Sequence, residues 1–408
     1  MTSKYIKSSE YFVWFGKVFG ISMFDLTSHG NDYFDCLYAV PSLAFYAYVC
    51  YRAFLDLQGY KSSEIDSDMP STAISLLMLQ HFLSLYFKVV YFYLRRKTFK
   101  AAFFKVHKLN EFLKLREEDY TMEILRVVGT LCIAIALNSY VELYTASSIW
   151  IILVHQLFYF VNYVEITLTY KMLNELSKQC RSINEHLQKR ISFLALDKIQ
   201  PKGKIWNELL DVKKLRESEK DSFFDSAYEM AEAHLAIGQI ATEINTVFGV
   251  SVLVAVLSDF TMLTCTTVTF CQDIRQLLNL GRVNYGIMLK AFNNAFHDAL
   301  ILTKECYSIY YWTKLKKTLK ATITCLHKMW NTLAKHNEID EKSNYLQLLI
   351  VQLFNGMPNF STFGIIIIDW PLIIYVISSA ATYVVIIMQF ELATEVQPNP
   401  IRNATITH

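Results

Sequence analysis

Seven long apolar segments limit most strongly what this chain can fold into. A helix of about 20 apolar residues crosses the hydrocarbon core of a bilayer, and each segment is near or above that length. Seven of them are too many for the core of one soluble domain, and charged residues make up only 19% of the chain. The sequence therefore predicts an all-α membrane protein with seven transmembrane helices, at Phe34–Phe54, Ile74–Leu94, Ile124–Tyr144, Ile149–Tyr170, Val247–Phe270, Tyr285–Trp312 and Pro371–Phe390.

The distribution of Lys and Arg predicts on which side of the membrane each connection lies. The connections after the second, fourth and sixth segments are rich in Lys and Arg, and the alternate connections hold few or none. Because basic loops stay in the cytoplasm, we expect the N-terminus inside and the C-terminus outside. Asn403, in an Asn-Ala-Thr sequon, would then be open to glycosylation. This orientation is the reverse of that of receptors coupled to G proteins.

Apolar residues recur at intervals of three and four in the predicted cytoplasmic connections, which is the spacing of an amphipathic helix. Four such stripes occur, at Leu173–Ile191, Phe224–Leu235, Leu315–Leu333 and in the stretch before Gly356. A helix with an apolar stripe must bury it against a partner. We expect these helices to pack on each other within one chain and between chains around a symmetry axis.

These patterns divide the chain into consecutive parts. We expect the last helix to run from Phe360 to Phe390, which is about 46 Å at 1.5 Å per residue and longer than the hydrocarbon core. Its first turns would then lie below or at the inner membrane surface, with Pro371 at the join as a kink or a helix start. The predicted parts are a cytoplasmic N-terminal segment (1–33), four transmembrane helices (34–170), cytoplasmic helical extensions (171–246), two transmembrane helices (247–312), further cytoplasmic helices (313–358), the last helix (359–390) and an extracellular tail (391–408).

The last apolar segment carries Thr382-Tyr383 and, after five apolar residues, Gln389-Phe390. This pattern resembles the signature that closes the last transmembrane helix of insect gustatory receptors, and the charge topology and intracellular stripes resemble the same family. The resemblance implies a ligand-gated, nonselective cation channel in the plasma membrane of sensory-neuron dendrites. It would be a homotetramer, or a heteromer with related subunits. Intracellular helices would form a central anchor, and the last helices would line a shared pore. Its partners would be a small-molecule tastant, membrane lipids and permeating cations.

Carried onto this chain, the resemblance places Gln389 and Phe390 near an outer constriction, with Thr382 and Tyr383 about two turns deeper. Intervals of three and four residues put Thr382, Ile386 and Gln389 on one helical face. Apolar rings gate by dewetting, and glutamine amide oxygens can face a passing cation. The small polar residues of this helix can equally serve close helix packing. Asp369 would either concentrate cations at the inner mouth or serve as a helix-start or salt-bridge residue.

In that family small molecules bind inside the bundle of the first six spans, toward the outer side. Polar residues within a membrane are costly and usually face the bundle or water, so they serve either as ligand contacts or as structural hydrogen-bond partners. A bitter or plant secondary compound is the expected ligand. Val384, where the main sugar-sensing branch commonly has Glu, disfavours that branch and leaves a fructose-like one open. The candidate ligand residues are Gln80, His81, Asn138, Tyr140, Glu142, Trp150, His155, Asp259, Thr264, Asn293, Asn294 and His297.

Other function classes find less support in the sequence. Metal-type Cys/His spacing, a phosphate-binding glycine loop and a nucleophile elbow do not occur, so we expect no enzyme, metal, cofactor or nucleic-acid partner. An odorant-receptor-like channel subunit is an alternative, against which the intact Thr-Tyr and Gln-Phe pairs argue. A transporter is a second alternative, but internal repeats and helices broken at mid-span are not evident.

Overall fold

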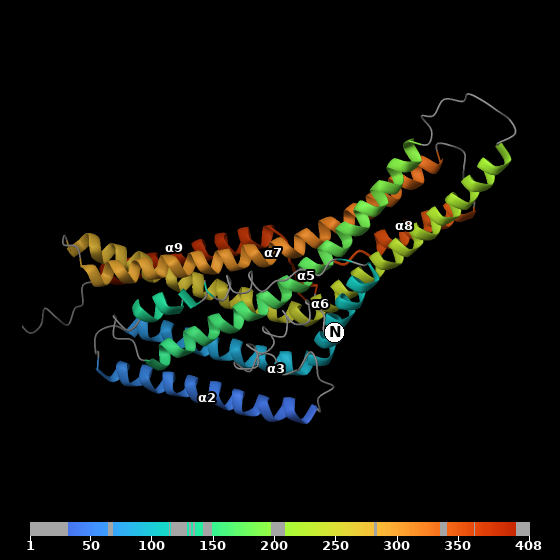
Figure 1. Cartoon of the computed structure of the whole chain (residues 1–408). Helices are drawn as coiled ribbons and strands as arrows, with labels where there is room; N and C mark the ends of the chain where they lie inside the picture. The colour runs from blue at the N-terminus through green and yellow to red at the C-terminus, as the bar shows by residue number, and fades with distance from the viewer. Residues whose placement is uncertain are drawn as a thin grey trace, which may run out of the picture.

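The structure, a computed structural model, describes residues 32–63, 68–113, 115, 129, 132–133, 135–141, 149–196, 209–280, 284–334, 341–362 and 364–396. Within these ranges the protein is almost entirely helical (Figure 1), as predicted. Predictions for residues 1–31, Glu142 and Asn403 lie outside the described residues. The elements are α2 (Asp32–Ser63), α3 (Asp68–Phe112), α5 (Ile149–Leu196), α6 (Leu209–Leu280), α7 (Tyr285–Ala334), α8 (Glu341–Asn355), β1 (Ser361–Thr362), β2 (Ile366–Ile367) and α9 (Pro371–Val396). Residues 135–141, in the third apolar segment, are also helical.

Three helices continue far beyond the apolar segments. α5 runs without a break from the fourth apolar segment to Leu196, α6 is 72 residues long and α7 is 50 residues long. Figure 1 shows these helices leaving the bundle as an extension, along which α8 lies. Few glycines and prolines interrupt them, so nothing in the local sequence ends the helices at the predicted membrane surface. The predicted continuity of helix between these apolar segments and the neighbouring amphipathic stripes is confirmed.

The apolar stripes of the extension are buried against each other. Leu176, Cys180 and Ile183 of α5 and Leu315 and Leu319 of α7 are fully buried, and all belong to one hydrophobic core. α7 packs on both α5 and α6. The expected packing within one chain is therefore confirmed.

Two described helical segments are long and apolar enough to cross a membrane by length and composition, Ser226–Asn279 and Pro371–Phe390. In the most apolar window of the first, 61% is buried inside the protein, against 17% in the second. The helices in the other apolar segments contain charged residues, such as Lys88 and Glu165, which lower their hydropathy. α9 therefore stands out because it turns most of its apolar surface away from its own chain.

The chain before α9 differs from the prediction of one helix over Phe360–Phe390. The helix begins at Pro371, and the preceding residues form a hairpin in which β1 pairs antiparallel with β2. Gly364 adopts a φ of 74° in the turn, a conformation that side chains with a Cβ rarely take. Proline is favoured at the first helical position, where its missing N–H costs no hydrogen bond. The prediction of a helix over residues 360–370 was wrong.

The hairpin is fixed to the two longest helices. The Asn245 side chain of α6 donates a hydrogen bond to the Ser361 carbonyl at 3.0 Å, and Trp312 of α7 packs on Phe360 with ring centroids 4.7 Å apart. Asp369 Oδ1 accepts the Trp370 N–H at 2.8 Å just before α9 begins. A carboxylate there interacts favourably with the positive end of the helix dipole, which suits the helix-start interpretation of Asp369.

His234 lies in the part of α6 that precedes the fifth apolar segment, and it is only 3% exposed. Burial lowers the pKa of His234 to about 4, because the imidazolium form loses its hydration. An unfolded histidine has a pKa near 6.5, so the unfolded chain binds a proton first as the pH falls. The free energy of unfolding therefore falls as the pH drops from about 6.5 to about 4, and at pH 5 it has fallen by about 2 kcal/mol.

The His234→Leu variant should show a weaker acid dependence than the wild type. Leucine does not titrate, so the fall in melting temperature between about pH 7 and pH 5 should be smaller. Thermal unfolding in detergent checks this, with the two proteins compared at about pH 8 to separate any effect on packing. Parallel curves down to about pH 5 would contradict the assignment.

Candidate functional site

A polar cluster lies inside the bundle, where α5, α7 and the helical residues 135–141 meet. His297 Nε2 is 2.6 Å from Asn138 Oδ1 and its Nδ1 is 2.8 Å from the Tyr159 hydroxyl. Asn293 Nδ2 donates to the same Oδ1 at 3.1 Å. Because that oxygen only accepts, Nε2 is the donor in this contact, and in the neutral imidazole the Tyr159 hydroxyl then donates to Nδ1. We call Asn138, Tyr159, Asn293 and His297 the His297 cluster.

Polar contacts between α6 and α7 adjoin this cluster. Asn294 Nδ2 donates to Asp273 Oδ2 at 3.2 Å. Asp298 accepts hydrogen bonds from the hydroxyls of Thr266 and Thr267, the latter at 3.0 Å. These contacts fix the rotation of α7 relative to α6. That rotation directs His297 toward α5.

Lysines and carboxylates form a second cluster farther along the same helices. Lys88 Nζ donates to Asn162 Oδ1 and lies 2.8 Å from Glu165 Oε2. Lys304 Nζ is paired with Asp259 and lies 3.7 Å from Glu305 Oε1. All of these residues are buried. We call the set the lysine network, which comprises Lys88 of α3, Asn162 and Glu165 of α5, Asp259 of α6, and Lys304 and Glu305 of α7.

The lysine network joins four helices through buried charges that neutralise one another. Lys88 also interacts electrostatically with Glu305, so the two ion pairs belong to one network. A charge buried without a partner is very costly. Removal of one member therefore leaves its partners in an environment that cannot solvate them.

The two clusters lie at different levels of the bundle. Along α7, seven residues separate His297 from Lys304, or about 10 Å at 1.5 Å per residue. Along α5, six residues separate Tyr159 from Glu165, or about 9 Å. The bundle therefore holds the His297 cluster at one level and, about one and a half to two turns away, the charged lysine network at another.

A polar interior within long apolar helices is typical of membrane receptors and transporters. The family model of the 7tm chemosensory receptors matches residues 12–394, nearly the whole chain. The chain belongs to the 7tm chemosensory receptor family. The comparison with curated proteins gave no match. The protein is therefore a membrane protein of a chemoreceptor family, and members of that family are generally not enzymes.

Sequence and structure agree on part of the receptor's polar interior. Asn138, Asn293 and His297 come together as predicted candidates, while Tyr159 was missed because tyrosine is common in apolar segments. Lys88 was missed as well, although a charged residue inside an apolar segment is a recognisable signal. In the structure Asp259 forms an ion pair with Lys304 of α7 and is not part of the His297 cluster.

Other candidate ligand residues of the receptor make separate contacts. The His81 ring packs 4.2 Å from that of Phe158, and Gln80 Nε2 donates to the Leu257 carbonyl at 3.3 Å. Trp150 contacts Tyr48 edge to face. Thr264 donates to the carbonyl of Phe260 in its own helix, and Tyr140 is 63% exposed. Asn294 bonds to Asp273, as described above. The side chain of His155 lies outside the described residues.

The last helix of the receptor has two different sides. Ala380 and Val384 are buried on the side that packs on α6. Thr382, Ile386 and Gln389 are exposed, and at 100° per residue they lie on the opposite side. Three of the residues predicted to line a pore thus share a face that their own chain leaves uncovered.

The aromatic residues of the same motif lie elsewhere on α9. Tyr383 contacts Phe260 of α6 edge to face, with ring centroids 5.7 Å apart. Phe390 is 66% exposed. Thr382 Oγ1 donates to the Ser378 carbonyl of its own helix at 2.9 Å, so its hydroxyl hydrogen is already engaged. Its methyl group and oxygen lone pair remain on the uncovered face.

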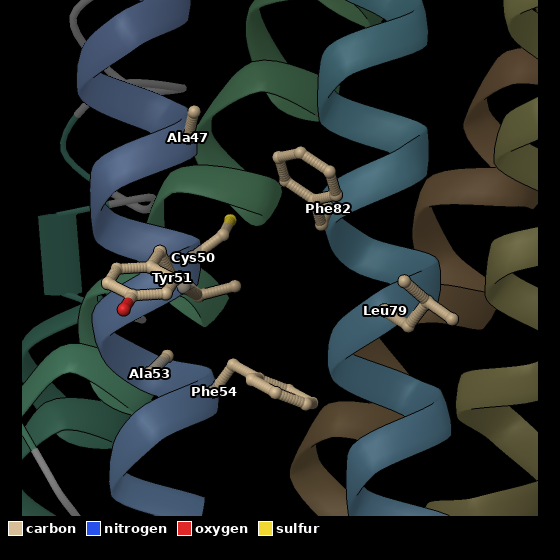
Figure 2. A pocket seen from close by; sticks show the side chains of 8 residues that line it. Ala47, Cys50, Tyr51, Ala53, Phe54, Leu79 and Phe82 are labelled. Atoms are coloured by element: carbon tan, nitrogen blue, oxygen red, sulfur yellow. The ribbon is translucent and has the colours of Figure 1, made fainter.

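An apolar cavity of about 350 Å³ lies between α2 and α3 (Figure 2). Its volume is within the range of small-molecule pockets, roughly 300–1,000 Å³. None of the residues predicted to bind ligand lines it. Its walls include Ala47, Cys50, Ala53 and Phe54 of α2 and Leu79 and Phe82 of α3.

Proposed function

We propose that four copies of this receptor form a ligand-gated cation channel in which α9 lines the pore. The observation that carries the proposal is the uncovered apolar surface of α8 and α9. On α8, Tyr345, Leu348, Val351 and Phe354 are 57%, 68%, 52% and 63% exposed. Exposed apolar patches of this kind mark interaction sites.

Lipid can cover the exposed side chains of α9 but not those of α8. α8 packs on α7 beyond the apolar segment, where the α7 sequence Lys314–Lys320 is strongly basic and suits water. The apolar surface of α8 must therefore be covered by another protein surface. A closed ring of identical chains covers it with the same surface in every copy.

The uncovered face of α9 suits a pore of low selectivity. In fourfold copy, Ile386 would form an apolar ring that gates by dewetting, and Gln389 a ring of amide oxygens. Neither carries charge, so strong discrimination between cations is not expected. Asp369 at the start of each α9 would supply negative charge near the inner mouth.

The His297 cluster supports a ligand site for a small polar molecule. It offers the Tyr159 hydroxyl, the His297 imidazole and two amides in a buried setting, and the Tyr159 and His297 rings lie 5.1 Å apart. Buried polar groups of this kind hold a ligand by hydrogen bonds, and the rings supply contact area. A bitter or plant secondary compound is our favoured tastant, with a sugar such as fructose the second choice. The Thr-Tyr and Gln-Phe pairs favour the gustatory over the odorant type.

Recordings from cells that express only this chain test the function. A panel of alkaloids and sugars should contain a compound that evokes a current far above the turnover of a carrier. Currents that saturate at carrier-like rates would favour a transporter. A response confined to volatile odorants would favour the odorant type.

The Gln389→Ala variant should change ion permeation without a change in assembly. Loss of the amide ring should shift the reversal potential or the basal current, because the pore then lacks those oxygens. Ile377→Ala is the matched control, since Ile377 is exposed on a different side of α9. Equal reversal potentials and basal currents in both variants and the wild type would place Gln389 outside the pore.

A further inference from the structure

Two stretches of the sequence place a pair of adjacent cations two and three residues before a hydroxyl. One stretch, RRKT, ends at Thr98, and the other, KRIS, ends at Ser192. Many protein kinases select their substrates by charge, because carboxylates of the kinase contact cations that precede the reacting hydroxyl. Both stretches carry this charge pattern, but they differ in their structural surroundings.

Ser192 lies near the end of α5, in a part that buries little apolar surface. Its side chain is exposed, and the helix ends soon after it, at Leu196. Among the described side chains of α5, Leu187 is the last that is buried, and those of residues 188–192 are exposed or half-buried. Helix ends fray, and the opening of residues 188–192 removes no fully buried side chain from the core. This segment is therefore able to adopt the extended form in which a kinase cleft holds its substrate.

Thr98 lies in a part of α3 that is held by the core. Its side chain is half-buried, and the next residue, Phe99, is 2% exposed. The helix continues from there to Phe112 and buries Phe103 and Val106 on the way. Local unfolding around Thr98 would expose these side chains to water, which is costly. The same charge pattern therefore stands before one hydroxyl that local opening makes available and one that the core retains.

The two hydroxyls also differ in their distance from the membrane. In the predicted orientation the fourth apolar segment ends at Tyr170, so Ser192 lies about 33 Å farther along α5 at 1.5 Å per residue. Thr98 lies only about 6 Å beyond the end of the second segment at Leu94. Figure 1 shows the end of α5 at the far end of the extension, away from the bundle. A soluble enzyme of the cytoplasm therefore reaches Ser192, whereas the bilayer obstructs its approach to Thr98.

The cations before Ser192 produce a positive potential at the end of α5. Lys189 is exposed and Arg190 is half-buried. Burial lowers the pKa of His186 on the same helix, and the charges of Arg190 and Lys189 lower it further. A positive potential of this kind attracts an enzyme surface that carries carboxylates.

We propose that Ser192 is a phosphorylation site for a cytoplasmic serine/threonine kinase that selects cationic substrates. The kinase transfers the γ-phosphoryl group of ATP. The bond between the γ-phosphorus and the oxygen of the β-phosphate breaks, and a bond from Ser192 Oγ to phosphorus forms. ADP leaves, and the hydroxyl proton passes to a carboxylate of the kinase. The proposal rests on the cytoplasmic placement of the extension, which the proposed function also assumes.

A phosphate on Ser192 would destabilise the end of α5. The Ser192 hydroxyl donates a hydrogen bond to the Gln188 carbonyl at 3.0 Å, and a phosphate dianion has no proton to donate there. Negative charge is also unfavourable near the C-terminal end of a helix, although Lys189, one turn earlier, offsets part of this cost. Opening would separate Gln188 from Cys325 of α7. The modification would therefore loosen the contact between α5 and α7 at the far end of the extension.

Phosphorylation of the full-length receptor tests the site. The receptor is reconstituted in lipid nanodiscs, which leave both membrane faces open to the enzyme. It is incubated with radiolabelled ATP and the catalytic subunit of a kinase that selects cationic substrates, and the modified residue is mapped by mass spectrometry. Ser192 should be labelled roughly tenfold or more faster than Thr98, because only its segment opens at little cost. Ser192→Ala should remove the label, and alanine suits a helix, so the fold should be retained.

Charge variants test how the site is recognised. Lys189→Gln combined with Arg190→Gln should lower the rate of labelling by roughly tenfold or more, the effect of lost charge-assisted contacts. Arg181→Gln is the matched control, since Arg181 is an exposed cation on the same helix, and it should be labelled like the wild type. Equal rates in the double variant and in Arg181→Gln would show that the cations before Ser192 do not select it.

Amide hydrogen exchange tests the consequence. Residues 188–196 should exchange faster in the phosphorylated receptor than in the unmodified one, while residues 171–183, which lie against the core, should not change. Equal exchange of residues 188–196 in the two forms would overturn the expected opening of α5.

Label that is equal in the wild type and in Ser192→Ala, or that falls mainly on Thr98, would overturn the proposal. Labelling needs no current, so a failure of the channel proposal leaves this result interpretable. A receptor that conducts but takes up no phosphate at Ser192 has lost only the modification site.

Discussion

The Lys304→Met variant should yield much less folded protein than the wild type. Methionine nearly matches the length of the lysine chain, but it leaves Asp259 and Glu305 buried without the ammonium group that pairs with them. Removal of one partner from a buried ion pair costs about 3–5 kcal/mol. That is a large part of the about 5–15 kcal/mol that keeps a typical domain folded. Gel filtration in detergent and the melting temperature measure the loss.

Two further variants separate charge from packing. The double variant Lys304→Met with Asp259→Asn removes both charges of the pair and should recover much of the lost stability. Lys290→Met makes the same chemical change at an exposed position of α7 and should behave like the wild type. If the double variant is no more stable than Lys304→Met alone, the lysine contributes through packing and our account of the network is wrong.

The Leu348→Glu variant should fold as a single chain but fail to assemble. Leu348 is 68% exposed in one chain, so a carboxylate at this position is solvated in the unassembled chain. In the proposed tetramer every copy would carry it into an apolar interface, where an unpaired charge is costly. We expect a loss of about 2 kcal/mol or more per copy, the size of a binding hot spot. Light scattering should show the mass falling from four chains to one.

The neighbouring residue gives the contrasting result. Leu349 is 6% exposed, against the core of its own chain, so Leu349→Glu should prevent folding itself. The two substitutions are chemically identical and one position apart, and they therefore separate assembly from folding. A Leu348→Glu variant that keeps the mass of the wild-type assembly would show that α8 does not form the interface.

Helical periodicity predicted much of this fold because it is a local property. Leu176, Cys180 and Ile183 recur at intervals of three and four whatever they later contact, and the structure buries all three. The hairpin before α9 escaped prediction, since a short apolar run such as residues 360–368 suits a strand as well as a helix. Gly364 and Pro371 were the available signals of a turn and a helix start.

The polar interior was predictable only as a set of residues, not as a set of pairs. Asn138 and His297 are 159 positions apart, and their contact depends on how two helices rotate against each other. The sequence contains no local record of that rotation. Lys88 and Glu165 differ from this case, because a charge within an apolar segment itself predicts an opposite charge nearby.

The unbroken length of α6 gives the receptor a mechanical property. The helix is 72 residues long, or about 108 Å, and the hairpin grips it at Asn245. From that point the charged level at Asp259 is about 21 Å away, and the far end at Leu209 about 54 Å away. A rigid tilt of α6 about Asn245 that moves Asp259 by a given distance would move Leu209 about two and a half times as far, in the opposite direction.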